Sequence, residues 1–371
     1  MPIAEIRIPI EDISRQYMLV KDEIAEAINL ALPGADAAPG PTLAAFEQEF
    51  ARYCQAKYCL GITSSNQALN LALAACEINY GDEVITVPNT YAAAIAAICY
   101  MGATPVFVDV DPVTFNLDIK QVEARITKKT KAILPVHLYG LPAEMDSLMA
   151  LARQYNLKVI EDVSHAHGAI YKGRKVGSIG DIGSFSFYPR KILGCYGDGG
   201  ALVTNDEEVY RRLQNLRATG RHKQFLNEVV GIPQHLDEMQ AIILQVKLRY
   251  LDHWIERRRH WAALYTDLLC ETPVVLPTEP AGLSHVYYQY TLRTVQRDEL
   301  LKYLTEHGIG AQVMYPLEVP YQHTYQDLGY KPGDFPAADT LVKEILSLPV
   351  FPELTDDEVR EVAGAIQDFF S

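Results

Sequence analysis

The chain has 371 residues, of which 49% are hydrophobic, and its formal net charge is −14 at pH 7. A chain of this length has room for about two domains, each able to bury its own core. Its acidic balance repels nucleic-acid phosphates, so we expect no nucleic-acid partner.

The N-terminal stretch MPIAEIRIPIEDISRQY carries charges throughout and lacks the apolar segment of a secretory signal. The most apolar window, residues 91–108, is broken by Gly102 and Pro105 and is too short to span a bilayer, so it predicts a buried helix and then a buried strand. None of the six cysteines forms a CxxC pair. These features predict a cytoplasmic protein with reduced thiols and no membrane association.

Along the chain, residues 12–31 have a helical apolar period, and a second amphipathic helix runs through FEQEFARYC. Short apolar runs then alternate with helical stretches. Seven of these runs are candidate strands: YCLGI, EVITV, PVFVDV, AILPVHLY, KVIEDV, IGSFSF and GALVT. Strands that alternate with helices predict an α/β domain with a mostly parallel seven-stranded sheet.

The pattern changes after a long helical region over residues 237–269. The segments that follow predict, in order, a strand in VYYQYTLRT, a helix in RDELLKYLTEHG, a strand in GAQVMYP and a closing helix in DDEVREVAGAIQDFF. We therefore expect a large α/β domain over residues 1–250 and a smaller α+β domain over residues 251–371.

Two segments carry side chains suited to chemistry. A buried strand ends in Glu161 and Asp162, which places carboxylates at the C-terminal edge of the sheet, where open α/β sheets bind ligands. Lys191 follows in an apolar, glycine-rich setting. Burial there lowers the pKa of a lysine and exposes its neutral nucleophilic amine, as Schiff-base chemistry requires. Taken alone, Lys191 is more simply a surface lysine and Asp162 a helix cap.

Longer motifs resolve this ambiguity. The chain contains, in order, GITSSNQALNLAL, GDEVITVPNTYAAAIAAI, GATPVFVDVDPVTFNLD, LPVHLYGLPAEMD, VIEDVSHAHGAIYKGRKVGSIGDIGSFSFYPRK, YGDGGALVTND and LDEMQAIIL. Over nearly its whole length it resembles the DegT/DnrJ/StrS-type sugar aminotransferases. These belong to the aspartate-aminotransferase fold (fold type I) and use pyridoxal 5'-phosphate (PLP).

The resemblance implies roles for individual residues. Lys191 matches the Schiff-base lysine, and Asp162 matches the acid that pairs with the pyridinium nitrogen. The remaining cofactor contacts implied are His165 at the phenolic oxygen, Tyr91 stacked on the ring, Ser186 at the phosphate, and Ser65, Asn66 and Gln67 in the phosphate loop before a helix. Plausible substrate-side residues are His222, Gln224, Tyr315 and Tyr321.

Two departures from the family pattern concern phosphate binding. The segment GIPQHLDE has Pro233 where an asparagine commonly reaches the phosphate of the neighbouring subunit, and His235 stands where arginine is common. The loop Ser65-Asn66-Gln67 replaces a Gly-Thr-Asp type of sequence. These changes leave the Schiff-base residues in place.

Other interpretations of these segments are weaker. His165 and His167 form an HxH pair, but no further ligand lies close in sequence and the cofactor already uses His165, so we expect no metal site and a hydrogen-bonded core role for His167. Cys195 suits a small buried side chain better than a nucleophile. GSIGDIGS precedes a strand and lacks the GxGxxG spacing of a dinucleotide loop.

The resemblance thus implies a homodimeric transaminase that moves an amino group from L-glutamate to a keto-sugar, expected to be a nucleotide-linked keto-deoxysugar, in amino-sugar biosynthesis. One alternative keeps the chemistry and changes the acceptor to a keto-cyclitol or a sugar phosphate. Another is a non-catalytic relative that acts as a regulator or scaffold.

Overall fold

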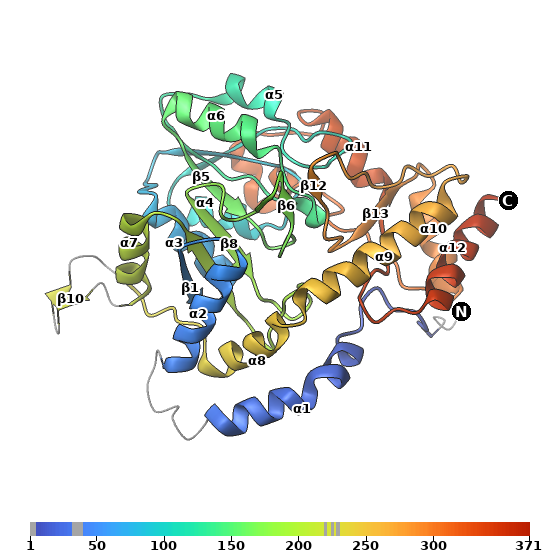
Figure 1. The fold of residues 1–371 in the computed structure, drawn as a ribbon. Helices are drawn as coiled ribbons and strands as arrows, with labels where there is room; N and C mark the ends of the chain where they lie inside the picture. The colour runs from blue at the N-terminus through green and yellow to red at the C-terminus, as the bar shows by residue number, and fades with distance from the viewer. Residues whose placement is uncertain (1–4, 32–39, 219–220, 224–225, 228–230) are drawn as a thin grey trace.

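The computed structural model describes residues 5–31, 40–218, 221–223, 226–227 and 231–371 (Figure 1). A seven-stranded sheet forms its centre, in the order β1-β9-β8-β5-β4-β2-β3. The strands are β1 (Tyr58–Ile62), β2 (Glu83–Thr86), β3 (Thr104–Phe107), β4 (Thr130–Ile133), β5 (Lys158–Asp162), β8 (Ile182–Ser186) and β9 (Gly200–Thr204). Each falls within or overlaps one of the seven runs predicted from the sequence, which confirms the α/β fold.

The direction of the strands positions the site. Four adjacent pairs, from β3 across to β8, are parallel, and β9 is antiparallel to both of its neighbours, β8 and β1. Strands β1, β2, β5 and β8 therefore all point the same way. Their C-terminal ends meet at one edge of the sheet, where a ligand site is expected.

Helices pack on the sheet and on one another, and the apolar periodicity predicted several of them. Their bounds are α1 (Ile13–Ala31), α2 (Pro41–Tyr53), α3 (Ser65–Ala75), α4 (Ala93–Tyr100), α5 (Ile119–Val122), α6 (Met145–Tyr155), α7 (Glu207–Arg217), α8 (Glu238–Leu248) and α9 (Leu251–Leu269). The window 91–108 forms buried α4 and then β3, as predicted. The predicted helical region 237–269 is divided into α8 and α9 at Arg249–Tyr250.

Three smaller sheets complete the strands. The short strands β6 (Ile170–Tyr171), β7 (Arg174–Lys175) and β12 (Leu283–Ser284) pair in the order β12-β6-β7, while β10 (Arg221–Lys223) pairs with β11 (Leu226–Asn227). In the C-terminal part, β13 (Tyr290–Arg293) pairs antiparallel with β14 (Ile345–Leu348). Helices α10 (Arg297–Glu306) and α11 (Pro336–Glu344) contact this pair, and α12 (Asp356–Phe370) packs on α9 and α10.

A second hydrophobic core forms in this C-terminal part. It joins the end of α9 to α10, α12 and the β13–β14 pair, and Figure 1 shows α9 extending from the sheet toward α10 and α12. Ile8 from the N-terminal segment also belongs to this core. The boundary between residues 250 and 251 remains a prediction.

One strand prediction in this part was wrong. Residues 310–316 form no strand, because their hydrogen bonds go to two different segments. The amide of Gly310 donates to Ile8 O at 2.7 Å and that of Gln312 to Ser347 O at 3.0 Å. With a single isolated bridge to β14, the segment builds no ladder.

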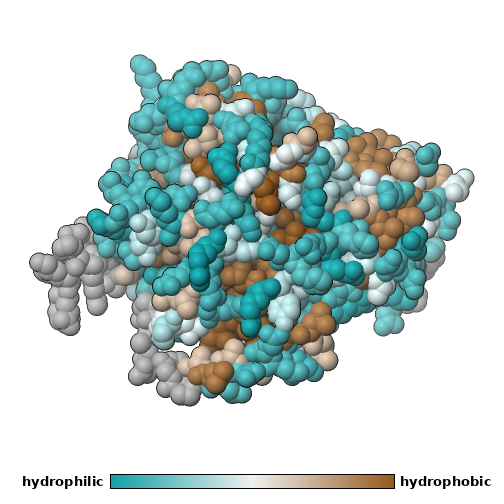
Figure 2. All heavy atoms as spheres, viewed as in Figure 1, coloured by the Kyte–Doolittle hydropathy of each residue, from teal (hydrophilic) through white to brown (hydrophobic). Residues whose placement is uncertain are grey.

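Hydrophilic residues predominate on the face shown in Figure 2, with apolar residues in smaller patches. Among the described helices, none combines the length and the apolar composition that a bilayer crossing requires. All six cysteines are free thiols, and four of them are buried.

Candidate active site

A cavity of about 470 Å³ opens at the shared edge of β1, β5 and β8. That volume is in the range of small-molecule sites. Seven of the eight site residues predicted from the sequence line it: Ser65, Asn66, Tyr91, Asp162, His165, Ser186 and Lys191. The eighth, Gln67, lines a neighbouring open hollow, and its amide donates to Ser64 Oγ at 3.3 Å.

Lys191 reaches this cavity from the loop that follows β8. Its Nζ lies 3.4 Å from Tyr288 Oη and 4.6 Å from the centre of that ring. Burial lowers the pKa of Lys191 to about 8, although the charges of Asp162 and Glu11 act in the opposite direction. With a pKa near 8, about a tenth of these amines are neutral at pH 7, several hundredfold more than for an ordinary lysine.

The two carboxylates at the end of β5 have different environments, because consecutive strand residues point to opposite faces. Asp162 lies in the cavity, where its Oδ1 accepts the amide of Ser164 at 3.0 Å. Glu161 points away into the protein and is fully buried. Only Asp162 is therefore placed to contact a bound ligand.

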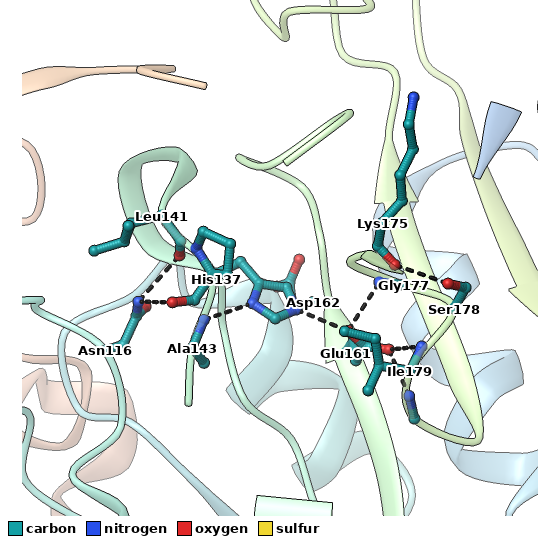
Figure 3. Close-up of polar contacts among 12 residues, drawn as sticks. Asn116, His137, Leu141, Ala143, Glu161, Asp162, Lys175, Gly177, Ser178 and Ile179 are labelled. Atoms are coloured by element: carbon teal, nitrogen blue, oxygen red, sulfur yellow. Dashed lines mark hydrogen bonds and ion pairs between the residues drawn. The ribbon is translucent and has the colours of Figure 1, made fainter. Parts of the chain in front are cut away.

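Glu161 instead holds a glycine-rich turn, as Figure 3 shows. Its carboxylate accepts amide protons from Gly177 at 2.8 Å, Ile179 at 2.8 Å and Gly180 at 2.6 Å, and it lies 3.0 Å from His137 Nε2. His137 Nδ1 accepts the amide of Ala143, so Nε2 carries the proton that His137 shares with Glu161. The segment GSIGDIGS, which lacks the spacing of a dinucleotide loop, is thus a structural turn around a buried carboxylate.

Burial opposes ionisation of Glu161, but the hydrogen bonds from His137 and the backbone outweigh it and place its pKa below the ordinary value. We expect Glu161→Ala to destabilise the protein at pH 7 by about 3 kcal/mol, because it leaves three buried amides without an acceptor. This stabilisation is fully present above the unfolded-state pKa and is lost as pH falls through the lower folded-state value.

Urea unfolding of the wild type and of Glu161→Ala at pH 7 and at progressively lower pH tests both statements. Glu208→Ala, which removes an exposed carboxylate from α7, is the matched control and should change little. Equal unfolding midpoints for wild type and Glu161→Ala at pH 7 would contradict the structural role of Glu161.

His165 follows β5 and lies deep in the cavity wall. Its Nε2 is 3.3 Å from Tyr315 Oη, and its ring centre lies 4.4 Å from that of Tyr288. Within the described residues, its buried Nδ1 has no hydrogen-bond partner. Burial, with the nearby charge of Lys191, holds the pKa of His165 well below its ordinary value, so the imidazole is neutral and keeps one nitrogen available.

We therefore expect the His165 imidazole to remain neutral between pH 5 and 8. Histidine ¹⁵N chemical shifts measured across this range should show no titration of the signal that disappears in His165→Gln. A titration midpoint near the ordinary value of about 6.5 would mean that water reaches this ring.

The hydroxyl and amide donors of the site come from two elements. Ser186, the last residue of β8, is buried, and its Oγ lies 3.4 Å from the amide of Tyr188. Ser65 and Asn66 form the first turn of α3, where free amides and the helix dipole favour an anion. Ser64 caps this helix and also lines the cavity. The sequence indicates that cap through the S-x-x-Q pattern of Ser64 and Gln67.

Two of the tyrosines suggested by the sequence also line the cavity. Tyr91 lines the cavity and is 63% exposed, and Tyr315 lines it from the segment after α10. Tyr321 is not among the lining residues, because its hydroxyl donates to Asp339 at 2.9 Å. Of the other suggested substrate-side residues, Gln224 and the side chain of His222 lie outside the described part of the chain.

The predicted burial of His167 is confirmed, whereas its hydrogen bond stays a prediction, with the backbone of Ser186 as the nearby group that acts against burial to raise its pKa. Its ring packs 5.6 Å from Phe185 and 5.9 Å from Phe187, centre to centre, and neither nitrogen has a partner within the described residues. Burial lowers its pKa to about 3, so the ring is neutral. Among the described residues, no group of three or more His, Cys, Asp or Glu side chains is arranged to hold a metal.

Several lining residues had not been predicted. They come from distant parts of the chain: Ile10, Glu11, Arg190, Asp198, Tyr288, Gln289, Gln312 and Met314. Arg190 and Asp198 lie close to Lys191 in the sequence, so that closeness could have predicted their place in the cavity. The others are brought in by tertiary packing and had no local motif.

Comparisons with known proteins agree with this architecture. The DegT/DnrJ/EryC1/StrS aminotransferase family matches residues 19–367. The pleiotropic regulatory protein of Geobacillus stearothermophilus is 44% identical over 368 residues, which cover 98% of this chain and 99% of that protein. The dTDP-3-amino-3,6-dideoxy-alpha-D-galactopyranose transaminase of Aneurinibacillus thermoaerophilus is 42% identical over 362 residues, covering 98% and 99%.

A solved structure gives the same result. The crystal structure of S. venezuelae DesV in complex with a ketimine intermediate superposes with a TM-score of 0.95 at 40% identity, covering 98% of this chain and 99% of that one. Fold and site thus define an aminotransferase of the aspartate-aminotransferase fold type. Within that class, the chain belongs to the DegT/DnrJ/EryC1/StrS aminotransferase family.

Proposed function

We propose that this chain is a PLP-dependent transaminase that moves an amino group from L-glutamate to a nucleotide-linked keto-sugar. The observation that carries the proposal is the buried amine of Lys191, which shares one cavity with the carboxylate of Asp162. The Aneurinibacillus relative is named a dTDP-sugar transaminase, which supports the substrate class.

The chemistry of the cavity fits PLP, which has an aldehyde, a basic ring nitrogen, a phenolic oxygen and a phosphate. Lys191 would meet the aldehyde and Asp162 the ring nitrogen, while the Nδ1 of His165, which has no partner among the described residues, suits the phenolic oxygen. Ser186, Ser65 and Asn66 would hold the phosphate at the N-terminus of α3. When bound, PLP supplies an electrophilic carbon for amines and a ring that accepts electrons from the reacting carbon.

The residues of the chain then have separable tasks. Lys191, with its lowered pKa, takes and returns a proton near neutral pH, which is the condition for efficient general acid–base work. The carboxylate of Asp162 stabilises a cationic ring nitrogen of the cofactor. The neutral imidazole of His165 donates or accepts a hydrogen bond without adding charge.

Two alternatives find less support. A keto-cyclitol or a sugar phosphate as the amino acceptor would require the same residues around Lys191. The Aneurinibacillus relative is named for a dTDP-sugar, which favours neither of these acceptors. The Geobacillus relative is named a pleiotropic regulatory protein, which is the observation in favour of a regulatory role. A scaffold has no need of a buried lysine amine that shares an open cavity with a buried carboxylate, so we favour catalysis.

We also propose that the enzyme works as a cytoplasmic homodimer. Helix α1 exposes Tyr17, Met18, Leu19 and Leu30, and exposed apolar side chains on one helix suit a subunit contact. The six free thiols suit a reducing compartment. Analytical ultracentrifugation tests the dimer, and a monomer at micromolar concentration would contradict it.

The direct test of the function is amino transfer. Purified protein reconstituted with PLP is incubated with L-glutamate and a dTDP-linked keto-deoxysugar, and mass spectrometry follows 2-oxoglutarate and the aminated sugar nucleotide. We expect both products in equal amounts. Parallel reactions with the free keto-sugar, a sugar phosphate and a keto-cyclitol separate the acceptors. Failure of L-glutamate to alter the absorbance of the bound cofactor would contradict the proposed donor.

A further inference from the structure

Tyr288 makes direct contact with the amine of Lys191, and the sequence motifs did not point to it. Its Oη lies 3.4 Å from Lys191 Nζ, and the same ring packs with its centre 4.4 Å from that of His165. The tyrosine is only 7% exposed. Because burial raises the pKa of Tyr288, its hydroxyl is a neutral group in contact with the reactive amine, on which the carboxyl groups of Asp162 and Glu11 also act.

The segment that carries Tyr288 is held in an irregular conformation. The sequence pattern predicted a strand from residue 286, but β13 begins only at Tyr290, and Tyr287 has a left-handed φ of 46°. The amides of Val286 and Gln289 donate to Gly140 O at 3.1 Å and Tyr139 O at 3.2 Å. A non-glycine residue with positive φ is maintained only where its surroundings fix it, and such residues gather at functional sites.

Two further contacts fix the same segment. A Cβ at Gly140 would come within 2.9 Å of the amide nitrogen of Tyr288, so only glycine permits this close approach. Nη1 of buried Arg258 lies within hydrogen-bond distance of three carbonyl oxygens, those of Tyr287 at 3.3 Å, Tyr288 at 3.4 Å and Val350 at 3.3 Å. The peptide of Tyr288 is therefore fixed on both of its sides.

We propose that Tyr288 is a positioning residue for Lys191, whose hydroxyl orients the ε-amine in both of its protonation states. The ammonium donates to Tyr288 Oη, and the lone pair of the neutral amine accepts the hydroxyl proton. Because the bond from the ammonium is charge-assisted, it is the stronger of the two and favours the protonated amine. The inference rests on the proposed function only in taking Lys191 as the reacting amine.

The first test uses cofactor-free protein and needs no catalysis. Lys191 is labelled with limiting acetic anhydride between pH 6 and 10, and the labelled peptide is quantified by mass spectrometry. We expect Tyr288→Phe, which keeps the ring and removes the hydroxyl, to lower the midpoint of Lys191 labelling by about half to one pH unit. The charged and titratable groups around this site, Asp162, Glu11, Arg190, Arg258, His165 and His167, are the same in every variant.

Tyr315→Phe is the matched control, because its hydroxyl lies in the same cavity but contacts His165 Nε2 instead. It should leave the Lys191 midpoint unchanged. Tyr288→Leu, which also removes the hydroxyl and adds no titratable group, should show the same downward shift and serves as the second variant if Tyr288→Phe folds poorly. An unchanged midpoint in both Tyr288 variants overturns the proposal, whether or not the protein is a transaminase.

In the reconstituted enzyme, Tyr288→Phe should lower kcat for the L-glutamate half-reaction by about tenfold and leave KM near the wild-type value. Gly140→Ala should produce the same pattern, because it displaces the peptide of Tyr288 without touching its hydroxyl. A rise in KM at constant kcat would instead make Tyr288 a substrate-binding residue and would overturn the positioning role. Inactive wild-type enzyme would contradict the proposed function and leave the labelling result standing.

Discussion

Lys191→Ala is expected to abolish amino transfer, with kcat falling by at least about a thousandfold, and to eliminate covalent attachment of the cofactor. The side chain is the only lysine that lines the described cavity, and its amine has the lowered pKa that nucleophilic attack requires. The measurements are the transamination assay and borohydride reduction in the presence of PLP followed by peptide mapping.

A second buried lysine provides a demanding control for this experiment. Burial also lowers the pKa of Lys247 to about 8, but its Nζ donates to Gly194 O at 2.6 Å and lies outside the cavity lining. If a lowered pKa alone selected the attachment site, both lysines would be labelled. We expect the label on Lys191 alone, retained in Lys247→Met. A label on Lys247 or on neither would overturn the assignment.

Much of this site was predictable because its parts follow strands. Asp162 and Ser186 are the last residues of β5 and β8, and Ser65 begins the helix that follows β1. Each of these strands appears in the sequence as a short apolar run, and the parallel arrangement follows from the helices between them. Parallel strands bring their C-terminal ends together whatever their separation along the chain, so seven of the eight predicted residues share one cavity.

The remaining features depend on tertiary packing that leaves no local pattern. Glu11 reaches the cavity from the N-terminal segment, and Tyr288 does so from a stretch whose alternating residues predict a strand. That stretch is irregular because Gly140 and Arg258, both distant in sequence, fix its peptides. In the same way, residues 310–316 have a strand-like composition, but the N-terminal segment competes for their hydrogen bonds.

The pair Glu161-Asp162 shows both what the sequence could predict about the site and what it could not. The sequence placed two carboxylates at the end of a buried strand, and the alternation of side chains requires that only one of them face the ligand edge. Which carboxylate faces the ligand edge depends on how the strand is oriented in the sheet, and the local sequence pattern does not determine that. The resemblance to the family selected Asp162. The structure also shows the role of the other carboxylate: Glu161 accepts backbone amides of the turn at Gly177–Gly180 and anchors it.

Asp162→Asn is the second large effect that we expect, a fall in kcat on the order of a hundredfold or more with little loss of stability. Asparagine has the same shape, and its side-chain oxygen can still accept the amide of Ser164, so the local fold is retained. The amide carries no charge and cannot stabilise a protonated ring nitrogen. Because the charge of Asp162 also raises the pKa of Lys191, the midpoint of Lys191 labelling should move below that of the wild type.

Asp181→Asn is the matched control for the loss of a carboxylate. Asp181 precedes β8 at the opposite edge of the same two strands, where it accepts the amide of Val159 at 2.8 Å and pairs with Lys158 at 2.9 Å. We expect this variant to keep the wild-type kcat and to lose some thermal stability. Full activity in Asp162→Asn, or an equal loss in Asp181→Asn, would show that the charge at the cavity edge of β5 does not support the reaction.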